Sequence, residues 1–514
     1  MATVAPHRVR PGRTAELGLI VLALALGVGA YVLVGIATTD SVPVDWLRYA
    51  GGLALLTLGL HVVLRVRAPY ADPVILPTAA AINGIGLAMI HRIDIAYEAR
   101  DKYAGFADRQ LAWTALGVLL AAAVILVLRD HRTLRRYTYT AMVVGLGLIL
   151  LPLVPGLGKE INGARIWIHL GGMSFQPAEF GKIALAVFFA GYLVTHRDTL
   201  ALAGPRFLGL QLPRPRDLGP ILVAWVVSLG VLVFERDLGT SLLFFGLFVG
   251  MLYLATERVS WVVLGTVLFG AGAMLAARTF PHVGNRFNVW LNALDQDVFN
   301  ASPGSGQLVR GLFGMASGGL FGTGWGKGRP DLVPYAESDF VIASLGEELG
   351  LTGLLAILVM YLVLVERGMR TAIGARDGFG KLFAGGMSFV IAFQCFVVVG
   401  GVTRLIPLTG LTMPFLAYGG SSLLANWMIA ALLLRISDSA RRPAAELGPI
   451  EADLFPEPEP EPAPVRVGSD HVTEVIDLRD DAVTADLPVA DRPVPDPSAP
   501  VPDPPAPEPG EDRP

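Results

Sequence analysis

Several ionisable residues of this sequence stand at the ends of apolar segments, where a membrane-spanning chain can carry out acid–base chemistry. Asp339 lies where a long polar segment, 278–338, meets the next apolar segment. A carboxylate held at a helix start beneath a loop has its pKa raised by desolvation, which suits a general base. A polar loop of this length between apolar spans is itself typical of a functional element. We therefore predict that Asp339 is a catalytic base at the outer membrane face.

A second pair of charges lies in the sequence KEINGARIWIHLGGMSFQPAEFGK, residues 159–182. Pro177 suits the first turn of a helix, and Glu179 complements the positive end of that helix dipole. Lys182 follows three residues later and so shares a helix face with Glu179. Two interpretations stay open: the pair lines an interior site, or it is a salt bridge that lets the helix start inside protein.

A third candidate is Asp237 in FERDLGTS, residues 234–241. The simplest interpretation is a helix N-cap. The glycine-rich stretch SGGLFGTGWGKG, 317–328, allows backbone amides to approach an anion but matches no nucleotide-binding fingerprint. Lys327 and Arg329 beside it are either phosphate ligands or solvated cations.

Proline and glycine interrupt a fourth apolar stretch, VTRLIPLTGLTMPFLAYGGSSLLANW, residues 402–427. Broken helices in membranes are tolerated only where they border protein or a water-filled cavity. We expect Arg404 near the outer end of such a cavity.

The composition determines the class of protein that must position these residues. Of 514 residues 53% are hydrophobic and 16% charged, with a mean hydropathy of +0.55. These values are typical of a polytopic membrane protein. The single cysteine, Cys395, excludes a disulfide framework and a cysteine metal site. We expect no nucleic-acid partner.

We predict an all-α fold with about twelve membrane spans. The spans are expected at about 17–37, 46–64, 73–91, 110–128, 138–155, 178–195, 218–234, 239–256, 260–277, 339–365, 383–403 and 415–435.

The distribution of lysine and arginine predicts the orientation. Residues 1–15 and alternate loops are rich in these cations, which places them in the cytoplasm and the 278–338 loop outside. The Pro-, Asp- and Glu-rich residues 437–514 predict a disordered cytoplasmic tail, either a solubilising extension or a docking segment. Nucleoside triphosphates are cytoplasmic, so an outer reaction needs a substrate that arrives already activated, such as a lipid-linked diphosphate sugar.

Five motifs in this order resemble the SEDS family (RodA/FtsW) of bacterial shape, elongation, division and sporulation proteins. They are NGARIW, QPAEFGK, RDLGTS, the block from SGGLFGTGWGKG to ESDFVIASLGEELGLTG, and PLTGLTMPFLAYGGSS. The resemblance covers about residues 73–436, or ten spans, which leaves two N-terminal helices within 16–72 and the tail as additions. Such additions are similar to those of the actinobacterial RodA branch. The chain departs from the family pattern at Ala178, Ala417 and Arg310, without losing an acid of the motifs.

The resemblance implies a peptidoglycan glycosyltransferase that polymerises lipid II at the outer face of the bacterial cytoplasmic membrane, in elongation and shape control. It also implies a class B penicillin-binding protein as partner. The family's essential acid falls on Asp339, its charged pair on Glu179 and Lys182, its tryptophan on Trp167 and its DLGT acid on Asp237.

The implied reaction turns an α-linked diphosphate into a β-glycosidic bond, and this inversion needs one general base, which we assign to Asp339. The released polyprenyl diphosphate needs positive charge, for which Lys182, Arg165, Arg404 and Lys327 are candidates. A divalent ion, Mg²⁺ or Mn²⁺, held by Glu179 and Asp237 is the alternative.

Three other functions stay open. A lipid II flippase would translocate its substrate without needing Asp339. A non-catalytic scaffold would need only contacts with its partners. The division-specific FtsW counterpart would carry out the same chemistry in another process.

Overall fold

The computed structural model describes residues 12–443, except 103–104, 162–163, 171–172, 202–205, 208–209, 212–222, 224–225, 228–229 and 232. Most of the predicted tail and of the N-terminal segment 1–15 therefore lies outside the described residues. The predicted span at 218–234 also falls largely on residues that are not described. The residues between 223 and 234 that the structure does describe are helical.

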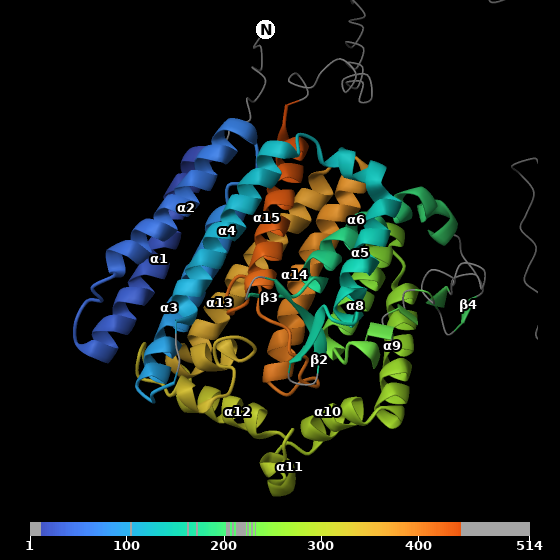
Figure 1. Cartoon of the computed structure of the whole chain (residues 1–514). Coiled ribbons are helices and arrows are strands. Elements are labelled where there is room, and N and C mark those ends of the chain that lie inside the picture. The colour runs from blue at the N-terminus through green and yellow to red at the C-terminus, as the bar shows by residue number, and fades with distance from the viewer. Residues whose placement is uncertain are drawn as a thin grey trace, which may run out of the picture. The chain divides into compact units, whose positions relative to one another are not determined.

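Eleven helices in the described part of the chain are long and apolar enough to cross a membrane. This confirms the prediction of a helical, multi-pass membrane protein (Figure 1). The helices are α1 (Arg13–Thr39), α2 (Trp46–Arg67), α3 (Ile75–Glu98), α4 (Phe106–Val127), α5 (Thr138–Leu150) between the 3-10 turns η1 (His131–Tyr137) and η2 (Leu151–Leu153), α6 (Ala178–Ala201), α8 (Leu238–Thr256), α9 (Val259–Thr279), α13 (Val341–Gly374), α14 (Gly378–Val402) and α15 (Gly420–Arg441).

Burial differs strongly between these helices. Most residues of α3 and α15 are buried, whereas α1 and α2 expose many apolar side chains. The helix α1 nevertheless packs closely on α3, because a Cβ at Gly27 would lie only 2.9 Å from the Cα of Gly84. The N-terminal pair is thus attached to the remaining helices by a glycine contact that larger side chains would prevent.

The outer segment 278–338 is more ordered than a loop. It contains α10 (Pro281–Leu291), α11 (Gln296–Asn300), α12 (Gly306–Gly318) and the 3-10 turn η4 (Pro330–Leu332). Figure 1 shows α10, α11 and α12 together at the end of the helices opposite the C-terminal end of α15. The segment is therefore built as a structured cover.

The prediction of an all-α fold misses a small sheet. The strands β1 (Gly158–Ile161), β2 (Ala164–Leu170) and β3 (Met173–Phe175) pair antiparallel in that order. Arg165, Trp167 and His169 alternate along β2 with apolar residues, which is the period of a strand. A second, very short pair is β4 (Arg206–Phe207) with β5 (Leu210–Gln211).

Residues 403–419, between α14 and α15, form no regular secondary structure, and we call them the broken segment. Side chains from surrounding helices satisfy its backbone carbonyls, as a membrane environment requires. Asn83 donates to the Phe415 carbonyl (3.0 Å), Gln110 to that of Ala417 (3.0 Å), Gln394 to that of Thr412 (2.8 Å), and the Tyr361 hydroxyl to that of Pro414. The broken segment therefore borders protein, as its sequence predicts.

Candidate active site

Asp339 lies in the turn just before α13, at the outer end of that helix. Its side chain is partly buried and faces the broken segment: a Cβ at Gly410 would lie 3.8 Å from its Oδ2 atom. Gly410 has a φ of +78°, a conformation that favours glycine. Among the described residues, no hydrogen-bond or ion-pair partner occupies the Asp339 carboxylate. It is therefore free to accept a proton.

The surroundings of Asp339 raise its pKa to about 7. Burial is the largest cause, and the negative charges of Glu337 and Asp237 add to it. The guanidinium of Arg286, on α10, acts in the opposite direction. Arg286 also donates to the Leu408 carbonyl of the broken segment (3.0 Å). A carboxylate with a pKa near neutral is suited to general-base catalysis.

Asp237 is buried and caps α8. Its side chain accepts hydrogen bonds from the backbone N–H of Gly239 (2.9 Å), from that of Thr240 (3.2 Å), and from the Thr240 hydroxyl. The capping interpretation of the sequence is therefore correct. The same helix start touches the broken segment, because a Cβ at Gly239 would lie 2.8 Å from the Thr409 carbonyl oxygen. The helix start that Asp237 caps therefore contacts Thr409, and Asp339 faces the next residue, Gly410.

Glu179 and Lys182 form an ion pair of 2.6 Å in the first turn of α6, and both are almost completely buried. The Lys182 ammonium also donates to the Gln394 amide oxygen (3.1 Å), and Gln394 donates to the Thr412 carbonyl. The pair predicted from the three-residue spacing is thereby confirmed. Through Gln394, Lys182 reaches the same broken segment that Asp339 and Asp237 face.

The strand β2 carries the two other candidates of this region. Arg165 is exposed and lies 3.7 Å from Glu160, while its backbone N–H donates to the Glu235 carbonyl (3.0 Å). Trp167 is partly buried and pairs with Lys159 of β1. The sheet is therefore joined to the turn that contains Asp237.

Arg404 is not a free cation. Its guanidinium donates to the carbonyls of Trp290 (2.8 Å) and Leu291 (2.6 Å), and the Trp290 indole donates back to the Arg404 carbonyl (3.0 Å). The side chain therefore binds the C-terminal end of α10, where a cation complements the helix dipole.

The glycine-rich stretch does bind an anion through its amides, but that anion belongs to the protein. The Glu348 carboxylate accepts from the backbone N–H of Gly326 (2.9 Å) and Gly328 (3.2 Å). Arg92 pairs with the same carboxylate at 2.8 Å. Lys327 is exposed beside this stretch. These amides are therefore unavailable to substrate phosphate, contrary to what the sequence suggested.

The prediction that Glu179 and Asp237 hold Mg²⁺ or Mn²⁺ finds no support in this donor set. Glu179 is neutralised by Lys182, and both oxygens of Asp237 already accept hydrogen bonds. Among the described residues, no three His, Cys, Asp or Glu side chains converge as a metal site would require. Glu179 and Asp237 therefore do not fit a divalent metal ion.

Glu235 is a buried acid that no sequence motif singles out. Its side chain is fully buried, and within the described ranges neither carboxylate oxygen has a hydrogen-bond partner. Burial, followed by the nearby charge of Asp237, raises its pKa to about 9. Glu235 is therefore neutral at pH 7, and its position two residues before Asp237 was the only signal in the sequence.

We expect Glu235→Gln to stabilise the fold increasingly as the pH rises. A glutamate whose folded pKa exceeds its unfolded pKa contributes stability that is complete below the unfolded value, near 4.5, and is lost as the pH rises through about 9. Glutamine does not titrate, so the variant lacks this loss. Thermal unfolding in detergent at pH 6 and pH 8.5 measures the difference, with exposed Glu98→Gln as control. Equal pH slopes for Glu235→Gln and the wild type would contradict a neutral Glu235.

Residues 73–442 match the model of the cell cycle protein family of FtsW, RodA and SpoVE. The chain belongs to this family. The SEDS resemblance seen in the five motifs is thereby confirmed, and α1 and α2 precede the region that the family model matches.

A relative from Mycobacterium tuberculosis (strain ATCC 25618 / H37Rv), the peptidoglycan glycosyltransferase RodA, is 51% identical over 436 residues. The alignment covers 84% of this chain and 92% of the relative. The corresponding protein of Mycobacterium leprae is 48% identical over 434 residues, covering 84% of this chain and 91% of the relative.

A solved structure from a study of a peptidoglycan synthase complex, concerned with polymerization and crosslinking, contains a chain of similar fold. That chain is 25% identical with a TM-score of 0.56, over 73% of this chain and 99% of the other. The crystal structure of Thermus thermophilus RodA gives 26% identity and a TM-score of 0.51, over 73% of this chain and 98% of that one. The family fold therefore extends across the helices that surround the broken segment.

Proposed function

We propose that this chain is a peptidoglycan glycosyltransferase that polymerises lipid II at the outer face of the bacterial cytoplasmic membrane. The observation that carries the proposal is Asp339, an outer carboxylate with a pKa near 7 and no partner in the part of the chain that the structure describes. The broken segment that Asp339 faces is also contacted by Arg286, by the helix start that Asp237 caps and, through Gln394, by Lys182. The chain is 51% identical to the mycobacterial RodA and 32% identical to a probable FtsW of Trichlorobacter lovleyi. This difference favours a role in cell elongation over a role in division.

The reaction needs one proton transfer. Asp339 removes the proton from the 4-hydroxyl of the incoming lipid II sugar while that oxygen attacks the anomeric carbon of the growing chain. The bond from the anomeric carbon to the lipid diphosphate breaks, and inversion converts the α-linkage to a β-linkage. Asp339 accepts the proton as the general base, and the positive charge of Arg286 stabilises the departing diphosphate. Lys182, which is paired with Glu179, is a second candidate for this role.

A class B penicillin-binding protein is the partner we propose. The polymer that this chain makes must be crosslinked, and the related solved structure belongs to a synthase complex concerned with both polymerization and crosslinking.

The decisive experiment reconstitutes the full chain with such a partner in proteoliposomes that contain fluorescent lipid II. Glycan polymer on a gel is the expected product. A flippase would translocate lipid II without making polymer, and a scaffold would do neither, so either result would exclude the polymerase.

The pH profile tests the role of Asp339 more directly. Because only the ionised carboxylate accepts a proton, kcat/KM is expected to rise about tenfold per unit below pH 7 and to level off above it. Arg286 holds the pKa of Asp339 down, so Arg286→Gln should shift this rise to higher pH. Arg278→Gln, which removes an exposed cation elsewhere, is the matched control. An unchanged midpoint in Arg286→Gln would count against Asp339 as the titrating group.

A further inference from the structure

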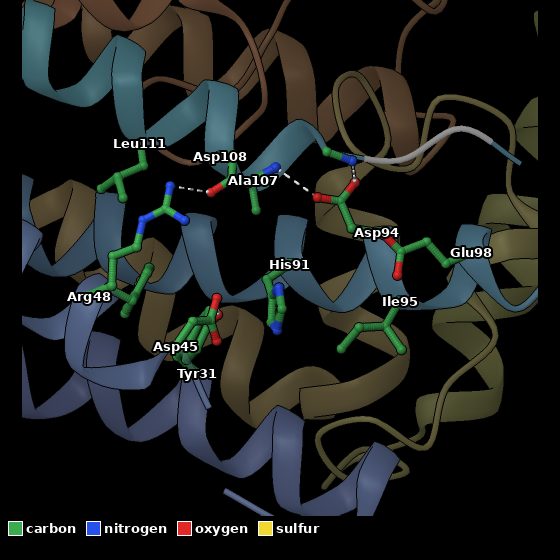
Figure 2. Close-up of a pocket in the computed structure, with 12 residues that line it drawn as sticks. Tyr31, Asp45, Arg48, His91, Asp94, Ile95, Glu98, Ala107, Asp108 and Leu111 are labelled. Atoms are coloured by element: carbon green, nitrogen blue, oxygen red, sulfur yellow. Dashed lines mark hydrogen bonds and ion pairs between the residues drawn. The ribbon is translucent and has the colours of Figure 1, made fainter. Parts of the chain in front are cut away.

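A pocket of about 160 Å³ lies between the N-terminal helix pair and the first two helices of the family region (Figure 2). Its walls are the outer parts of α1 to α4: Tyr31, Asp45, Arg48 and Tyr49 come from the added pair, and the other lining residues from α3, α4 and the loop between them. A cavity of this volume is large enough for several water molecules or a small polar group. The pocket would not exist without α1 and α2.

Carboxylates dominate the charge of this pocket. Asp45, Asp94, Glu98 and Asp108 line it, against Arg48 and His91. The four acids outnumber the cationic groups by two even when His91 is protonated. This excess of negative charge favours a ligand that carries a positive charge.

The acids differ in how far they are already engaged. Asp94 accepts from three backbone N–H groups of the α3–α4 connection, at 3.0, 3.0 and 2.8 Å, and Asp45 accepts from the Tyr31 hydroxyl at 2.8 Å. Asp108 and Arg48 form an exposed ion pair of 3.0 Å, of a kind that contributes little and is easily exchanged. Glu98 is exposed, and its carboxylate has no hydrogen-bond or ion-pair partner among the described residues. Asp45, Glu98 and the Arg48–Asp108 pair can therefore still form hydrogen bonds or ion pairs with a ligand.

An aromatic stack closes one side of the pocket. Tyr31 lies between Tyr49 and His91, with ring centroids 4.1 and 4.3 Å apart. The His91 ring borders the cavity, and among the described residues neither of its nitrogens has a hydrogen-bond partner (Figure 2). This unpaired polar ring is an observation independent of the acids, and it indicates a ligand with hydrogen-bonding groups.

The position of the pocket indicates where the ligand comes from. The C-terminal ends of α1 and α3 and the N-terminal ends of α2 and α4 meet here, at the outer ends of these apolar helices. Val44, which precedes Asp45, is 101% exposed, and Leu47, which precedes Arg48, is 65% exposed. Such apolar side chains next to a charged pocket suit a ligand whose tail stays in the bilayer.

We propose that this pocket binds the head group of an aminophospholipid from the outer leaflet. The ammonium group lies among the carboxylates, where its N–H groups donate to them and to His91. The phosphate lies at Arg48, and the acyl chains run along the apolar turn between α1 and α2. A zwitterionic head group matches this pocket because its ammonium group faces the carboxylates and its phosphate faces Arg48. A basic peptide would instead place a second cation next to Arg48.

The test measures lipid binding to the purified full chain by native mass spectrometry. Phosphatidylethanolamine, phosphatidylcholine and phosphatidylglycerol are titrated separately. We expect phosphatidylethanolamine to bind about tenfold more tightly than phosphatidylglycerol. Several partly screened ion pairs between the ammonium group and the carboxylates together supply a free energy of about this size. Phosphatidylcholine, which has the same charges but no N–H donor, should bind more weakly than phosphatidylethanolamine.

Two double variants complete the experiment. Asp45→Asn/Glu98→Gln removes two exposed carboxylates of the pocket and should reduce the preference to about twofold or less. Asp295→Asn/Asp297→Asn makes the same charge change at α11 and should keep it. Equal binding of phosphatidylethanolamine and phosphatidylglycerol to the wild type, or an unaltered preference in the pocket variant, overturns the proposal. Binding of an oligolysine peptide that the pocket variant loses, without a lipid preference, would assign the pocket to a basic polypeptide instead.

Discussion

Replacing Asp339 with asparagine is expected to reduce the rate of lipid II polymerisation about 10²- to 10⁴-fold, the usual contribution of a general base. Asparagine has nearly the same shape but cannot accept the proton from the attacking hydroxyl. The Asp339 carboxylate has no hydrogen-bond or ion-pair partner among the described residues, so the substitution removes no structural contact there. Initial rates with fluorescent lipid II and a class B partner measure the effect.

The same change at Asp295 is the control for Asp339→Asn. Asp295 is an exposed acid on the outer segment, and Asp295→Asn should polymerise lipid II at the wild-type rate. The midpoint of thermal unfolding should be at least as high in Asp339→Asn as in the wild type, because a buried carboxylate becomes neutral. Residual activity above about a tenth of the wild-type rate would show that another group accepts the proton.

The position of this acid could be predicted from the sequence because it depends on local pattern. The change from a polar segment to an apolar span places Asp339 at a helix start, and the helix begins two residues later at Val341. The i, i+3 spacing of Glu179 and Lys182 likewise predicts their ion pair. The positions of most membrane-spanning helices can also be predicted, because long apolar segments are visible in the hydropathy of the sequence alone.

The partners of the site could not be predicted, because they meet through the broken segment. Gln394, Arg286 and Gly239 come from three different helices, and each contacts a different residue of that segment. No spacing in the sequence encodes these distances. The glycine-rich stretch shows a prediction that was too specific. Its pattern indicates an anion site, but the anion is the carboxylate of Glu348, 20 residues from Gly328 in the chain.

Breaking the buried pair of α6 should have the largest effect on stability. Lys182→Met leaves Glu179 buried without its cation and Gln394 without its donor. Removing one partner of a buried ion pair costs about 3–5 kcal/mol. We therefore expect a much lower midpoint of thermal unfolding in detergent. Exposed Lys327→Met, a matched substitution on the outer segment, should leave the midpoint unchanged.

The double variant Glu179→Gln/Lys182→Met separates a structural role from a catalytic one. It carries no buried charge at this point, so it should regain most of the stability lost in Lys182→Met. If Lys182 supplies positive charge to the departing diphosphate, polymerisation stays low although the fold is restored. If the pair only allows α6 to start inside protein, the double variant polymerises lipid II at close to the wild-type rate. Because both buried side chains lie on one helix turn and reach the broken segment through Gln394, stability and rate measured on the same preparations decide between the two roles.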